Sequence, residues 1–138
     1  MPLTPDVETF QIHEGTSGIF TALLTDNDGV TVVPGSVLLT LTLTLYVIKQ
    51  NGQDQIVNGR DQQSVLNTNN VQVLDTPLTD STGRRYNLIW SIQPGDTAII
   101  EDALRYERHI ALFQWTAPNN TSGNAEVILN VKNLRRIG

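Results

Sequence analysis

The sequence lacks several features, and each absence excludes a class of protein. It contains no cysteine, so disulfide bonds, thiolate metal sites and cysteine nucleophiles are ruled out. Nine basic residues stand against fourteen acidic ones, and the formal net charge of -5 disfavours nucleic-acid binding through phosphate neutralisation. Long apolar runs are also missing, so we expect neither a membrane span nor a secretory leader. The 138 residues suffice for one domain with its own core.

The segment 37–49 has the clearest pattern in the chain. Leucines occupy every second position, and threonines fill most of the positions between them. A period of two matches the pleat of a β-strand, whereas a helix would spread these leucines around its whole circumference. We therefore expect a strand with one buried face. The residues of that face are Leu39, Leu41, Leu43, Leu45 and Val47.

Similar strand signals recur along the chain, with turn sequences such as Asn51-Gly52 between them. Residues 60–70 are the exception and predict a short helix or a loop. The segment 105–116 is apolar on both faces near its end, which predicts a central strand that is covered on both sides or contacts another subunit. The further expected strands are 8–13, 18–25, 30–33, 55–57, 71–74, 85–92 and 125–131.

Short strands at this spacing predict an all-β fold, an antiparallel two-sheet sandwich of the immunoglobulin-like kind. We expect a single domain overall, with an N-terminal arm and first strand over residues 1–17 and the sandwich over residues 18–138. The expected core between the two sheets contains Leu41, Leu43, Trp90, Leu112 and Leu129.

The two histidines are the first candidates for a metal or catalytic site. His13 adjoins Glu14, and Glu107 would share a strand face with His109. Two histidines on separate strands have no recognisable ligand spacing. We interpret Glu107 and His109 as strand-surface residues that form hydrogen bonds across the sheet.

The sequence Asp26-Asn27-Asp28-Gly29 resembles the start of a calcium loop. Its glycine is in the fourth position rather than the sixth, and the closing glutamate is missing. A β-turn is the better interpretation. We predict no metal site and no cofactor.

Four acidic residues lie close enough in sequence to be considered as a glycosidase pair: Asp96, Glu101, Asp102 and Glu107. We interpret them as acidic loop residues, and no serine lies in a Gly-x-Ser-x-Gly elbow. We therefore predict no catalytic residue and no enzymatic activity. The sequons at Asn119 and Asn120 are compatible with glycosylation and also with an ordinary hairpin connection.

Four segments of the chain carry a pattern known from other proteins: 56–71, 88–96, 107–115 and 127–134. In these segments the chain resembles small β-sandwich structural proteins of tailed-bacteriophage virions. The resemblance covers most of the chain from about Gly18 onward and implies a virion setting. It supplies no catalytic residues. Its polar parts, which we interpret as loop and hairpin fixtures, are Arg60-Asp61 and the Glu107-x-His109 pair.

This resemblance implies a non-enzymatic virion protein, foremost a capsid decoration or cement protein that bridges capsid subunits. The alternatives are a head-to-tail connector or tail component and, from another class, a carbohydrate-binding or hydrolysing tail module. The latter needs Trp90 or Trp115 in a solvent-facing groove. The expected partners are the major capsid protein or other virion subunits, with self-association in the virion and no nucleic acid or membrane.

Both chain ends are candidates for attachment. Residues Met1 to Val7 include two prolines and little apolar content, so we expect an arm that lies on a neighbouring subunit. Lys132, Arg135 and Arg136 form a basic tail that either meets an acidic capsid surface or is merely solvated.

Overall fold

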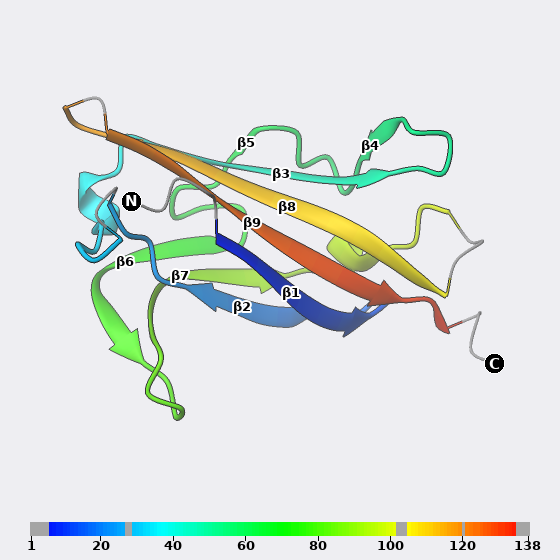
Figure 1. Cartoon of the computed structure of the whole chain (residues 1–138), viewed down its shortest axis with the longest axis horizontal. Coiled ribbons are helices and arrows are strands. Elements are labelled where there is room, and N and C mark those ends of the chain that lie inside the picture. The colour runs from blue at the N-terminus through cyan, green and yellow to red at the C-terminus, as the bar shows by residue number, and fades with distance from the viewer. Residues whose placement is uncertain (1–5, 27–28, 102–104, 120, 135–138) are drawn as a thin grey trace.

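The computed structural model describes residues 6–26, 29–101, 105–119 and 121–134 and consists mainly of two β-sheets that pack face to face (Figure 1). No helix in these ranges is long and apolar enough to cross a membrane. The elements are β1 (Asp6–His13), β2 (Gly18–Ala22), η1 (Gly35–Val37), β3 (Thr40–Ile48), β4 (Asp54–Ile56), β5 (Gln63–Ser64), β6 (Val71–Thr79), β7 (Arg85–Ile92), η2 (Pro94–Thr97), β8 (Tyr106–Ala117) and β9 (Thr121–Lys132), where η marks a 3-10 helix.

The strands divide between a large and a small sheet. The large sheet has the order β1-β9-β8-β3-β4, and the short β5 also pairs with β3. The small sheet has the order β2-β7-β6. This division and order are those of a variable-type immunoglobulin sandwich, in which the C, F and G strands lie in one sheet and the B, E and D strands in the other. The expected fold class is confirmed.

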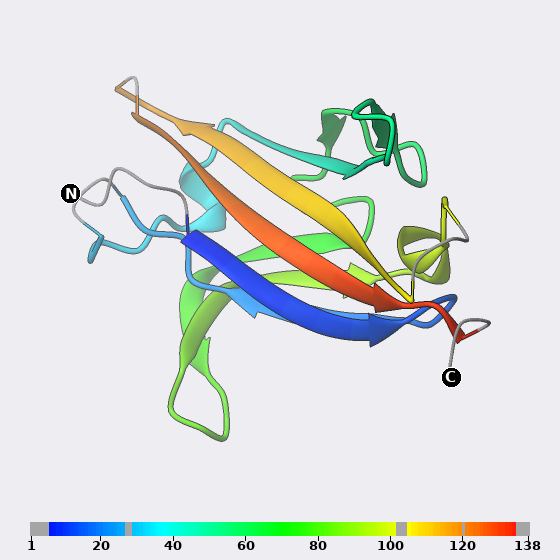
Figure 2. The same ribbon diagram turned by 45° about the vertical axis from the view of Figure 1, so that its right-hand side comes forward.

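One strand pair departs from the antiparallel pattern. β1 runs parallel to β9 along its whole length, at the edge of the large sheet (Figure 2). β1 and β2 are consecutive but belong to different sheets, and the turn between them contains Gly15 with a left-handed φ of 67°. Because the chain changes sheets there, β1 takes β9 as its partner rather than β2.

The alternation in β3 places its leucines as expected. Leu41, Leu43, Leu45 and Val47 are buried in the core. Leu39 is wrongly assigned to that face, since it is 62% exposed. It precedes the strand, where the chain has just left η1 and the side-chain alternation of β3 has not yet begun.

The core also contains the predicted Trp90 and Leu129. The rings of Trp90 and Phe113 pack edge to face across the two sheets, with centroids 5.6 Å apart. Leu112 is wrongly assigned to the core, because it is only half-buried and lies on the opposite face of β8 from Phe113. Both faces of β8 are apolar, so the sequence pattern alone does not select the inward one.

The ambiguous segment 60–70 forms a loop that contains β5 and no helix. Several of its residues and the preceding Asn58 have positive φ values, which asparagine tolerates better than most side chains. β6 is longer than the expected 71–74, and a register shift between Val73 and Leu78 carries it on to Thr79. The expected strand 30–33 is reduced to a single bridge between Thr25 and Val32.

The expected terminal arms are corrected where the structure describes them. Asp6 and Val7 belong to β1, so the N-terminal arm cannot extend to Val7. Lys132 is the last residue of β9 and pairs with Tyr106 rather than standing in a tail. Residues 1–5, Arg135 and Arg136 lie outside the described residues.

Candidate functional site

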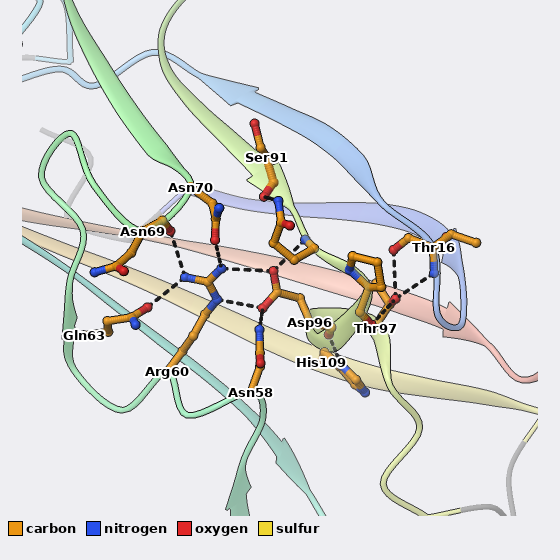
Figure 3. A network of polar contacts seen from close by, with 12 residues as sticks. Thr16, Asn58, Arg60, Gln63, Asn69, Asn70, Ser91, Asp96, Thr97 and His109 are labelled. Atoms are coloured by element: carbon orange, nitrogen blue, oxygen red, sulfur yellow. Dashed lines mark hydrogen bonds and ion pairs between the residues drawn. The ribbon is translucent and has the colours of Figure 1, made fainter.

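A buried ion pair joins two loops of the sandwich (Figure 3). Arg60 lies in the loop after β4, and Asp96 lies in η2, between β7 and β8. Arg60 Nε is 2.6 Å from Asp96 Oδ1, and Nη2 is 3.2 Å from Oδ2. The two side chains are 3% and 0% exposed. A planar guanidinium that meets both oxygens of a carboxylate fixes the position of both groups.

Arg60 has five N–H groups, and its contacts engage all of them. Besides the two that go to the carboxylate, Nη1 donates to Gln63 Oε1 (2.8 Å) and to the Asn69 carbonyl (3.1 Å). Nη2 donates to Asn70 Oδ1 at 3.0 Å. The guanidinium carbon also lies 6.0 Å from the centre of the Trp90 ring. The guanidinium therefore has no donor left for an external anion.

The carboxylate of Asp96 is equally saturated. Its Oδ1 accepts a hydrogen bond from Asn58 Nδ2, and its Oδ2 accepts one from the Gln93 N–H, both at 2.8 Å. The second contact reaches back to the residue before η2, as in a capping box. The next residue, Thr97, uses its hydroxyl to accept from the Thr16 N–H at 3.1 Å and reaches the Thr16 carbonyl at 2.9 Å. η2 is thereby fixed to the turn between β1 and β2.

A second buried pair adjoins the first. His109 Nδ1 is 2.8 Å from the Asp96 carbonyl, and Nε2 is 2.7 Å from Glu107 Oε1. A carbonyl can only accept, so Nδ1 carries a hydrogen. Glu107 also accepts from the backbone N–H groups of Ile100 (2.8 Å) and Glu101 (2.7 Å). The predicted shared strand face is confirmed, but both side chains are buried, so their interpretation as strand-surface residues is wrong.

The surroundings of Glu107 favour its ionised form. Burial raises the pKa of this carboxyl group, but three hydrogen bonds and the charge of His109 outweigh burial, and the pKa is lowered overall. Through the backbone N–H groups of Ile100 and Glu101 and the Asp96 carbonyl, the pair ties β8 to the loop before it.

The other histidine and the described part of the calcium-like sequence belong to separate local structures. His13 is exposed on β1, and Glu14 Oε1 accepts from the Leu134 N–H at 2.8 Å. Asp26 begins a turn in which its carbonyl accepts from the Gly29 N–H at 2.9 Å, as the turn interpretation expects. Asn27 and Asp28 lie outside the described residues. Within the described ranges, no cluster of three or more histidine or acidic residues could hold a metal.

Of the four candidate carboxylates, the three in the described residues each accept hydrogen bonds from within the chain. Asp96 and Glu107 are engaged in the two buried contacts described above, and Glu101 accepts a hydrogen bond from the Gln50 N–H at 2.8 Å. Asp102 lies outside the described residues, as does Asn120 of the overlapping sequons. Asn119 belongs to the β8–β9 connection, which is a tight hairpin.

Neither tryptophan meets the condition set for a sugar-binding groove, because Trp90 and Trp115 are both buried. An open hollow of about 400 Å³ does lie beside Asn70, over the small sheet. Its lining has amide, hydroxyl and aliphatic groups but no charged side chain, so it offers no acid or base. The lining residues are Asn67, Thr68, Asn70, Val71, Gln72, Ile89 and Ser91.

The Arg60–Asp96 pair is the feature that sequence reasoning missed. Arg60 was expected only as a loop fixture and Asp96 only as an acidic loop residue. One signal could have pointed to the pair: Arg60 is the sole basic residue between Lys49 and Arg84, in a stretch rich in asparagine. The same stretch also contains Asp54, Asp61, Asp75 and Asp80, so this signal alone does not select Asp96 as the partner.

Comparison with known proteins assigns no family. No family model matches the chain, and no curated protein sequence does. Among solved structures, one match is the extracellular domain of the voltage-gated sodium channel beta4 subunit, which forms parallel homodimers and has a role in cell–cell adhesion. It is 11% identical, covers 94% of each chain and superposes with a TM-score of 0.34. A likeness at this level carries no conclusion about function.

Proposed function

We propose that this protein is a non-enzymatic structural module of a bacteriophage virion, foremost a capsid decoration or cement protein. We infer that the protein is non-enzymatic from one observation: the buried polar groups bind to one another and not outward. Arg60, Asp96, Glu107 and His109 are the buried charged or titratable residues in the described ranges, and they satisfy one another and the surrounding backbone. A catalytic group needs a donor, acceptor or nucleophilic atom that faces the substrate, and the polar atoms of these four side chains are already engaged within the chain.

The virion setting is supported by the sequence resemblance over segments 56–71, 88–96, 107–115 and 127–134. These segments supply much of the closed network and the central strands β7, β8 and β9. A decoration protein needs a rigid body that presents surfaces to neighbouring subunits. A sandwich whose loops are joined by a buried ion pair and hydrogen bonds meets that need. The partner is then the major capsid protein or another virion subunit.

Quantitative mass spectrometry of particles purified from the phage or induced prophage that encodes the chain tests this function. A capsid decoration protein should be present at a copy number on the order of hundreds, a multiple set by the capsid symmetry. A copy number of about six or twelve would overturn the capsid position and indicate a connector or tail component. Absence of the chain from purified particles would refute the virion function altogether.

A further inference from the structure

The outer face of the large sheet carries an apolar cluster separate from the core. Alternation along each strand turns these side chains away from the small sheet, since their sequence neighbours Leu45, Val47, Ala111 and Leu129 are core residues. The members of this outer cluster are Tyr46, Ile48, Tyr106, Ile110, Leu112 and Ile128.

The centre of the cluster is a row of residues paired across three strands. Tyr46 on β3 pairs with Ile110 on β8, and Ile110 pairs with Ile128 on β9. Ile128 is only 8% exposed and yet does not belong to the core cluster, so it is covered by its neighbours on the outer face. Two members toward one end of the strands stay open, Ile48 at 58% exposed and Tyr106 at 39%. Antiparallel sheets usually keep such a face polar, so this one has the composition of a covered face.

Opposite charges lie on either side of this row. Glu126 on β9 pairs with Leu112, one row toward one end of the strands, and Arg108 on β8 pairs with Asn130, one row toward the other end. Burial first, and then the charges of Glu126 and Asp54, raise the pKa of the Tyr46 phenol, so both carboxylates lie near the row. Asp54 is on β4, where it pairs with Ile48. The described residues show no ion pair between Arg108 and Glu126.

We propose that the outer face of the large sheet binds a second copy of this chain. The two copies are related by a two-fold axis that lies in the interface and runs across the strands at the Tyr46–Ile110–Ile128 row. This rotation reverses the strand direction, so the central row faces the same row of the second copy, and each other row faces the row on the opposite side of the centre. The apolar row then packs on itself, and Arg108 of each copy faces the row that holds Glu126 of the other.

Charge complementarity selects this arrangement. A two-fold axis along the strands would instead place Arg108 opposite Asn130 and Glu126 opposite Leu112, with no ion pair formed. In the proposed dimer, the row of Tyr106 and Lys132 meets the uncharged row of Thr42, Gln114 and Asn124. Asp54 lies in the row of Arg108 but on β4, and two strands separate β4 from the β9 strand that carries Glu126. A face that is its own complement under one rotation fits a second copy of the chain. The proposal does not depend on the virion function.

Sedimentation equilibrium of the purified chain, over a wide concentration series, tests the proposal. The wild-type chain should dimerise. Glu126→Arg and Arg108→Glu should each weaken dimerisation by at least about tenfold, because each creates two like-charge contacts per dimer. The double variant should return close to the wild-type dissociation constant. Asp61→Arg, which makes the same charge change at an exposed loop position, should have no effect.

A fifth variant guards against misfolding of the charge variants. Ile48 is largely exposed in the isolated chain, so Ile48→Asp should preserve the thermal unfolding midpoint while weakening the dimer. A wild-type chain that stays monomeric at the highest concentration would overturn the proposal. So would single reversals without effect, or a double variant as weak as either single one. The particle copy number measured for the proposed function is a separate result that neither outcome changes.

Discussion

Replacing Asp96 with asparagine tests the claim that the buried ion pair holds the loops together. The substitution preserves size and shape but leaves Arg60 as an uncompensated cation, with both side chains almost fully buried. The new amide group must also direct hydrogens at a donor, either the guanidinium or the Gln93 N–H. Breaking a buried pair by removing one partner costs about 3–5 kcal/mol. That is a large part of the roughly 5–15 kcal/mol that stabilises an ordinary domain.

Urea unfolding followed by tryptophan fluorescence measures this loss, because Trp90 and Trp115 are buried and become exposed on unfolding. Asp61→Asn makes the same chemical change at an exposed position of the same loop and should stay within about 0.5 kcal/mol of the wild type. Arg60→Met combined with Asp96→Asn should lose clearly less than the sum of the single losses, because each removes the same contact. A loss below about 1 kcal/mol for Asp96→Asn, or simple additivity, would refute the role assigned to the pair.

Two further predictions concern the core and the acid limb of stability. Leu43→Ala should lower the free energy of unfolding by about 2–5 kcal/mol, whereas Thr42→Ala on the other face of β3 should cost less than about 1 kcal/mol; the reverse order in urea unfolding would show that the faces of β3 are misassigned. Because the pKa of Glu107 is lowered in the folded chain, ionised Glu107 stabilises the fold above its unfolded pKa of 4.5, and this stabilisation is lost as the pH falls below that value. Glu107→Gln should therefore flatten the acid limb of a plot of unfolding free energy against pH. Parallel plots for the variant and the wild type would contradict this sign.

The sequence predicts those strands in which one face is polar. β3 and β7 alternate between buried and partly exposed positions, so the positions of Leu43 and Trp90 follow from a period of two. β8 is apolar on both faces, and nothing local distinguishes Leu112 from Phe113. The difference lies in the packing of the second sheet, which the period of one strand does not report.

The buried network lies beyond sequence reasoning for a different reason. Arg60 and Asp96 are separated by three strands, β5, β6 and β7, and only the completed sandwich brings their loops together. The Glu107–His109 pair was within reach because its members are two residues apart on one strand. Even there the pattern gave the shared face and not the burial, which depends on the loop through Ile100 and Glu101 that covers Glu107.

The parallel pairing of β1 with β9 sets an order of events during synthesis. β1 leaves the ribosome before the other described strands, and its partner, residues 125–132, is made after them. Until then the backbone groups of β1 lack their strand partner, and Phe10 and Ile12 lack the β9 part of the core. A chain interrupted before β9 keeps two open strand edges, on β1 and on β8, and such edges invite aggregation and degradation. The paired or unpaired state of β1 therefore distinguishes chains that contain β9 from chains interrupted before it.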